Sequence, residues 1–125
     1  MTSAATSASA RILVVDDDDA VRDAVCDVVT MLGYTAEPAS DASEALHRFR
    51  PGRYDLVVTD LTMPVMNGLQ LARRLRALEP TLPITIFSAT ALPTEAAPEV
   101  TGLMVARKPD VDALVRLIQR ALGRP

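Results

Sequence analysis

A single stretch, residues 54–68, constrains the fold of this chain most strongly, and its sequence is Y-D-L-V-V-T-D-L-T-M-P-V-M-N-G. The run Leu56-Val57-Val58 is apolar without polar alternation, which is typical of a parallel strand that is covered on both faces. Asp60 follows this strand, and Asn67-Gly68 supplies a turn before a helical pattern begins near Leu69. Ligands of open α/β sheets bind at the carboxyl ends of the strands, so this pattern places Asp60 at the ligand-binding edge. An aspartate in this position is a metal ligand, a nucleophile or a turn-former.

Composition narrows the class of protein. The chain has 125 residues, which is enough for one domain with a real core, and 49% of them are apolar. Aromatic residues make up only 3% and tryptophan is absent, so the core must be built mainly from aliphatic side chains, as in a layered α/β protein. The net charge of -3 argues against a surface for nucleic acid or anionic membranes.

Targeting signals are not recognisable in the sequence. No run approaches the ~18 apolar residues of a membrane span, and the Ala/Ser/Thr-rich start lacks the basic and apolar regions of a secretory signal. The one cysteine, Cys26, cannot form an intramolecular disulfide, and its apolar helical setting predicts a buried thiol. We therefore expect a cytoplasmic protein without a membrane span.

Strand and helix patterns alternate along the chain after a short, small and uncharged segment, residues 1–10, which we predict to be a disordered arm. The predicted strands are 12–15, 35–39, 56–59, 84–87 and 103–106, and the predicted helices are 20–32, 42–49, 69–78 and 111–122. This alternation is typical of a doubly wound parallel sheet. Pro38 cannot donate a ladder hydrogen bond, so the second strand should lie at an edge. Residues 91–101 hold two prolines, so a fourth helix there should be short or irregular.

Several side chains in the predicted helices and turns have an ordinary structural explanation. His47 has no acidic or thiol partner nearby in the sequence, so we expect a surface or packing role for it. Met63 and Met66 should pack around the loop that follows Asp60. A solvated helix face is the simplest interpretation of the arginines of the third predicted helix, Arg73, Arg74 and Arg76.

Polar residues gather where the predicted strands end. Four adjacent carboxylates, Asp16 to Asp19, follow the first strand. Asp18 or Asp19 can cap the next helix, which leaves Asp16 and Asp17 for another task. Asp60 ends the third strand, Ser88 ends the fourth, and Lys108 follows the fifth.

These strand-end residues suggest a binding site. Three carboxylates in one crevice suit a hard cation such as Mg²⁺, which takes oxygen ligands. Lys108 is the only lysine beside twelve arginines, so the chain has kept one compact point charge at this edge. If a phosphoryl group joined Asp60, the cation, the lysine and the Ser88 hydroxyl could each meet one of its oxygens.

The motifs I-L-V-V-D-D, D-L-T-M-P-x-M-N-G, Ser88-Ala89 and Lys108-Pro109 occur in this order. Together they resemble the receiver domains of two-component response regulators, a family whose stand-alone members include chemotaxis regulators. The resemblance covers residues 11–125. It implies a flavodoxin-like α/β fold with a five-stranded parallel sheet in the order 2-1-3-4-5.

The resemblance also implies roles for individual residues. Asp60 would be the phosphoacceptor, and Ser88, Ala89 and Lys108 would contact the phosphoryl group. Receivers have two positions that flank the water attacking the acylphosphate, here Thr62 and Thr90, and neither side chain is long enough to orient that water. We therefore expect slow self-dephosphorylation. The implied Mg²⁺ ligands are Asp16, Asp17, Asp60 and the backbone carbonyl of Thr62.

Three features depart from the pattern of the family. Val105 stands where a switch aromatic is usual, Asp110 stands where another aromatic is common, and the interval from Ser88 to Lys108 is slightly short. The phosphorylation chemistry is therefore expected to be intact, whereas the output is expected to be altered.

The first functional hypothesis is a phosphorelay switch and not a metabolic enzyme. It would take a phosphoryl group from a histidine kinase or phosphotransfer protein and act on a downstream protein target, without binding nucleic acid. The alternative is a phosphorylation-independent docking module that uses residues 91–101 as a partner surface. A Mg²⁺ phosphohydrolase is a weaker third hypothesis, because Thr62 cannot serve as the acid/base carboxylate that such chemistry wants there.

Overall fold

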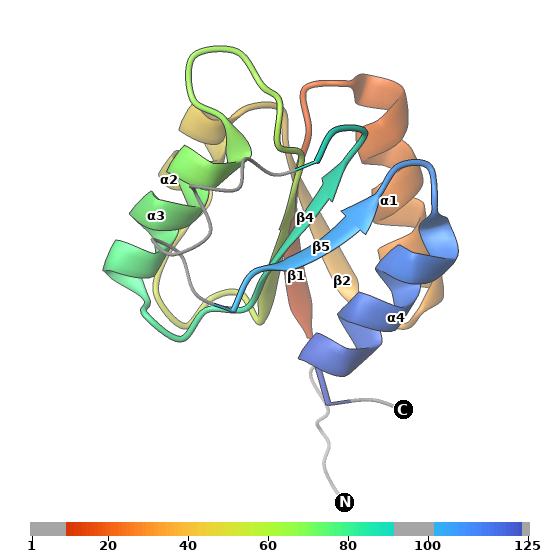
Figure 1. Cartoon of the computed structure of the whole chain (residues 1–125). Helices are drawn as coiled ribbons and strands as arrows, with labels where there is room; N and C mark the ends of the chain where they lie inside the picture. Colours follow the sequence, from red (N-terminus) through yellow and green to blue (C-terminus); the bar gives the residue numbers. More distant parts are fainter. Residues whose placement is uncertain (1–9, 92–101, 124–125) are drawn as a thin grey trace, which may run out of the picture.

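The structure, a computed structural model, describes residues 10–91 and 102–123. Five parallel strands form one sheet in the order β2-β1-β3-β4-β5, which confirms the predicted strand order and the edge position of Pro38. Helices α1 and α4 cover one face of the sheet and α2 and α3 cover the other (Figure 1). The strands are β1 (Arg11–Val15), β2 (Thr35–Ala39), β3 (Leu56–Thr59), β4 (Ile84–Ser88) and β5 (Met104–Arg107). The helices are α1 (Asp19–Met31), α2 (Ala42–Arg48), α3 (Gly68–Leu78) and α4 (Val111–Ala121).

Alternating side chains of the central strands feed two separate apolar layers, because successive residues of a strand point to opposite faces. Leu13 and Val15 of β1 pack in the layer beneath α2 and α3. Ile12 and Val14 pack in the layer beneath α1 and α4. All four side chains are at most 1% exposed, so β1 is covered on both faces, as its unbroken apolar sequence predicted.

Polar caps fix where the helices begin, since the first N–H groups of a helix have no partner within it. Asp18 accepts hydrogen bonds from the first turn of α1, and Asp41 caps α2. Asn67 and Gln70 form a reciprocal capping box at the start of α3. The helices therefore start within one residue of the predicted positions, and β5 lies one residue later than predicted. The predicted irregular helix, within residues 91–101, and the predicted N-terminal arm, residues 1–10, lie outside the described residues except for Ala91 and Ala10.

The prediction of a solvated arginine face on α3 was wrong for one member. The Arg76 side chain reaches beyond the end of α3, and its Nε donates a hydrogen bond of 2.6 Å to the carbonyl oxygen of Leu82. Burial lowers the pKa of this guanidinium. Arg76 therefore ties α3 to the loop that leads into β4, a role that helical spacing alone does not reveal.

Three other side chains can be compared with their predicted settings. His47 is exposed on α2, as expected for a surface role. Met63 is buried in the core and Met66 packs against it. Cys26 is half-buried and not fully buried, and desolvation raises the pKa of its thiol.

A polar cluster links β1, β2 and the residues that precede β3, away from the carboxyl ends of the strands where Asp60 lies. Glu37 of β2 forms ion pairs with Arg11 and Arg53, and it accepts a hydrogen bond of 2.8 Å from the Tyr54 hydroxyl. Desolvation raises the pKa of Glu37, but the hydrogen bonds from Tyr54 and the two arginines outweigh it, so the pKa lies below the ordinary value. The ionised form of Glu37 is therefore the form that stabilises the fold.

Replacing this carboxylate should make stability less dependent on pH. Glu37→Gln is expected to lower the free energy of unfolding at pH 7 by about 1 kcal/mol, because an amide cannot form charge-assisted bonds with both arginines. A lowered folded pKa contributes stability above the unfolded pKa and loses it as the pH falls through the folded pKa. The difference between Glu37→Gln and the unchanged chain should therefore vanish in acid. Urea unfolding at a series of pH values measures it, with Asp27→Asn as an exposed control, and a difference independent of pH would contradict this account.

Candidate functional site

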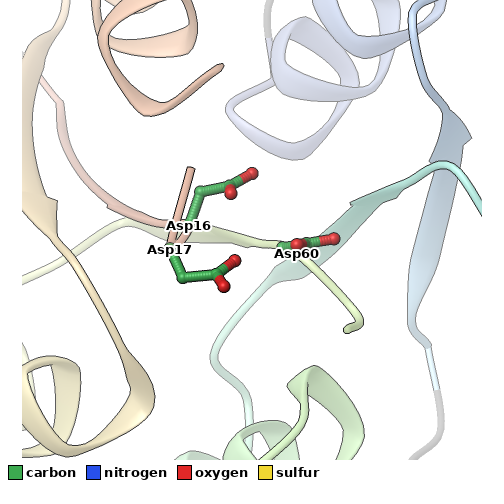
Figure 2. A group of neighbouring side chains, drawn as sticks. All are labelled: Asp16, Asp17 and Asp60. Atoms are coloured by element: carbon green, nitrogen blue, oxygen red, sulfur yellow. The ribbon is translucent and has the colours of Figure 1, made fainter. Parts of the chain in front are cut away.

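Three aspartates from two adjacent strands converge at the carboxyl edge of the sheet. Asp16 and Asp17 follow β1 and Asp60 follows β3, and these strands pair in register so that Val15 lies opposite Thr59. One carboxylate oxygen from each aspartate lies within 4.8 Å of the other two. Figure 2 shows the three side chains leaving the two strand ends next to one another. Asp16 and Asp60 are buried, whereas Asp17 is exposed.

Lys108 completes the cluster from the end of β5. Its Nζ lies 2.9 Å from Oδ2 of Asp16 and 3.4 Å from Oδ1 of Asp60. Its backbone N–H donates to the carbonyl oxygen of Ser88, which fixes the turn after β5 against the end of β4. The ammonium group of Lys108 thus bridges the two buried carboxylates of Asp16 and Asp60.

The electrostatics of the cluster favour a further positive charge. Desolvation and the negative charge of Asp16 raise the pKa of the Asp60 carboxyl, while Lys108 and a backbone hydrogen bond from Thr62 only partly offset this. Burial lowers the pKa of Lys108, but the carboxylates of Asp16 and Asp60 outweigh burial and raise it, so Lys108 stays charged. A bound cation would relieve the repulsion that remains between the carboxylates.

Hydrogen bonds hold Asp16 in place. Its Oδ1 accepts from the backbone N–H of Asp18 at 2.9 Å, and its carbonyl oxygen accepts from Nη1 of Arg22 at 2.9 Å. Arg22 is also paired with Asp19, so the exposed acidic residues of the first turn have structural tasks. The sequence patterns did not single out Arg22. An arginine one turn after four aspartates was the available signal.

Gly68 is a second residue whose role the sequence patterns missed. A Cβ atom on Gly68 would lie 2.2 Å from the carbonyl oxygen of Asp60, far closer than atoms tolerate. The N–H of Gly68 also donates to the carbonyl oxygen of Leu61 at 2.7 Å. The sequence indicated only a turn at the Asn67-Gly68 pair. It did not indicate that the start of α3 approaches the backbone of Asp60 this closely.

Ser88 lies at the same edge of the sheet, but its hydroxyl is engaged within its own loop. Ser88 is 1% exposed, and its Oγ accepts a hydrogen bond of 3.0 Å from the N–H of Thr90 and lies 3.2 Å from the Thr90 hydroxyl. The carbonyl oxygen of Ala89 accepts from Arg107 of β5. Val105, which stands where the family usually has a switch aromatic, is exposed on β5. The structure therefore brings the four charged residues together, whereas the Ser88 hydroxyl is hydrogen-bonded to Thr90.

The donor set fits a divalent, oxygen-seeking cation. Carboxylate oxygens from Asp16, Asp17 and Asp60 lie close enough to share one ion, and Mg²⁺ needs few protein ligands because it keeps several waters. No histidine or cysteine is part of this group, so a softer metal has no matching ligands there.

These features define the class of protein. The chain belongs to the response regulator receiver domain family, because the model of that family matches residues 12–118. Receiver domains are signalling modules of two-component systems, and the acidic pocket with Lys108 is the site expected of one. In the part of the chain that the structure describes, none of the helices could cross a bilayer.

Individual relatives agree with this class. The response regulator MprA of Mycobacterium ulcerans is 44% identical over 81 residues, which are 65% of this chain and 35% of that protein. The chain thus spans about a third of the length of such relatives. The solved structure of the chemotaxis protein CheY4 of Vibrio cholerae is similar with a TM-score of 0.82 and 28% identity, covering 91% of this chain and 99% of that one. The response regulator protein TrrA of Thermotoga maritima, solved in complex with Mg²⁺-BeF, has a TM-score of 0.80 and 28% identity over 90% of this chain and 98% of its own.

Proposed function

We propose that Asp60 accepts a phosphoryl group from a phosphohistidine of a histidine kinase or phosphotransfer protein, in a Mg²⁺-dependent reaction, and that the modified chain acts on a downstream protein. The observation that carries this proposal is the convergence of three carboxylates and Lys108 at one strand edge. The similar receiver TrrA was solved with Mg²⁺ and a beryllofluoride group, which supports the same ligands here.

The reaction needs little covalent chemistry from the protein. A carboxylate oxygen of Asp60 forms a bond to phosphorus as the bond from phosphorus to the histidine nitrogen breaks, and that nitrogen leaves with the electron pair. Lys108, already 3.4 Å from Asp60, is positioned to balance the charge of the phosphoryl oxygens. Asp16, Asp17, Asp60 and the carbonyl of Thr62 would hold Mg²⁺, and the bound ion would supply further charge neutralisation for the transfer.

Titration with Mg²⁺ in the presence and absence of beryllofluoride tests this function. Tryptophan is absent, so backbone amide NMR shifts are the suitable signal. We expect Mg²⁺ alone to shift amides around Asp16, Asp17 and Asp60, and beryllofluoride to extend the changes to Ser88 and Lys108. Amide shifts that do not respond to either addition would favour the phosphorylation-independent docking module.

The lifetime of the phosphoryl group should be long. Thr62 is exposed beside Asp60, and Thr90 is hydrogen-bonded to Ser88. Both side chains are threonines, so neither offers a carboxylate or amide to orient an attacking water. Changing Thr62 to Asn and Thr90 to Glu together is expected to speed the loss of label by about a hundredfold, the lower end of the usual contribution of a positioned proton-transfer group. Decay of radiolabelled protein measures it. Equal decay of both proteins would contradict the role of these positions.

A further inference from the structure

Val65 adopts a backbone conformation that is costly for its residue type. Its φ is 70°, in the left-handed region, and the N–H of Met66 donates a 2.8 Å hydrogen bond to the carbonyl oxygen of Pro64. A hydrogen bond that spans a single residue with positive φ is the rare and strained kind of γ-turn. A β-branched side chain tolerates this backbone worst, because its Cβ substituents crowd the neighbouring carbonyl.

Contacts of the Val65 side chain within the chain do not offset the free-energy cost of this turn. The Val65 side chain is 104% exposed, as open as in an extended peptide, while its neighbour Met63 is buried. Glycine would adopt the same turn at no steric cost, and asparagine would adopt it at a small one. Strained residues of this kind concentrate at functional sites. The benefit of an apolar side chain at this position therefore lies in contact with another molecule.

Val65 stands directly beside the acidic cluster. It lines a hollow of about 250 Å³ together with Asp17, so the hollow leads from the valine side chain to one of the three carboxylates. It also lines a second hollow of about 490 Å³ together with Arg73 and Arg74 of α3. A partner that reaches Asp17 through the first hollow therefore contacts the exposed Val65 side chain.

We propose that Val65 is an apolar contact through which the chain recognises its protein phosphodonor. The complementary surface is an apolar recess beside the phosphohistidine of the donor, with acidic side chains opposite Arg73 and Arg74. A small acyl phosphate has no such recess, so its reaction with Asp60 does not use Val65. This inference rests on the proposed phosphoacceptor function and adds the means by which protein donors are selected.

Comparing a protein phosphodonor with a small-molecule phosphodonor tests the role of Val65 separately from the phosphoacceptor function. Val65→Asn keeps the turn and removes the apolar side chain, and Met31→Ala, at an exposed position on α1, is the matched control. The protein donor is the kinase that labels the unchanged chain fastest within a panel of autophosphorylated histidine kinases, and the small donor is acetyl phosphate. We expect Val65→Asn to slow transfer from the kinase by about tenfold, the size of a lost buried valine contact, with its acetyl phosphate labelling unchanged. Its thermal midpoint should rise, because strain is relieved, and Met31→Ala should alter neither labelling rate.

Every other result counts against the inference. Unchanged transfer from the kinase, or an equal loss with both donors, overturns the role of Val65 in recognising a protein. Labelling by acetyl phosphate but by none of the kinases also overturns it, while leaving the phosphoacceptor function standing. Labelling by neither donor refutes the phosphoacceptor function itself, and the recognition of a donor with it.

Discussion

Replacing Asp60 with asparagine is expected to abolish labelling by acetyl phosphate in the presence of Mg²⁺, whereas the unchanged chain should take up one phosphoryl group. The amide of asparagine cannot form the acylphosphate, and it removes one of the three carboxylates that surround the cation site. Incorporation of radiolabelled phosphoryl measures the effect. Stoichiometric labelling of Asp60→Asn would contradict the assignment of the acceptor.

The same substitution should not damage the fold. The pKa of Asp60 is raised by burial and by Asp16, so the ionised carboxylate costs stability at pH values above its folded pKa. Asparagine never ionises, so the free energy of unfolding of Asp60→Asn at pH 7 should equal or exceed that of the unchanged chain. If Asp60→Asn lost both its labelling and its folded structure, the missing label would reflect unfolding and not the loss of the acceptor. Urea unfolding distinguishes the two.

Gly68→Ala is expected to lower the free energy of unfolding by about 3 kcal/mol and to reduce labelling of Asp60 more than tenfold. The new Cβ would meet the carbonyl oxygen of Asp60 at 2.2 Å, and a backbone atom cannot move aside as a flexible side chain can. The start of α3 or the loop after β3 must shift, which displaces the acceptor from Lys108.

Gly52→Ala is the matched control for this prediction. Gly52 has a positive φ of 82°, but a Cβ there would meet nothing within 4 Å, so it tests backbone strain without a clash. We expect a cost of about 1 kcal/mol and normal labelling. Equal stability of Gly68→Ala and the unchanged chain, with equal labelling, would contradict the close-approach account.

The framework of the fold could be predicted because its signals are local. Unbroken apolar runs such as Ile12 to Val15 predict buried parallel strands, Pro38 predicts an edge, and aspartates before apolar helices predict caps. The convergence of Asp16, Asp17 and Asp60 also followed, since residues just after parallel strands meet at one edge of the sheet.

Other features depend on contacts that sequence spacing does not encode. Arg76 was predicted to face solvent because its helix carries three arginines, yet it bends to the carbonyl of Leu82 six residues away. The need for Gly68 comes from the approach of two backbones, and the positive φ of Val65 belongs to a tight turn within the loop between β3 and α3. Tertiary geometry decides each of these cases.

Identification of the modified residue tests the central claim most directly. The chain is incubated with acetyl phosphate and Mg²⁺, the acylphosphate is reduced with borohydride, and peptide mass mapping locates the reduced residue. The account predicts reduction at Asp60 alone, with loss of the signal when Mg²⁺ is removed by a chelator. Modification at Asp16, Asp17 or His47 in place of Asp60, or no modification at all, would contradict it.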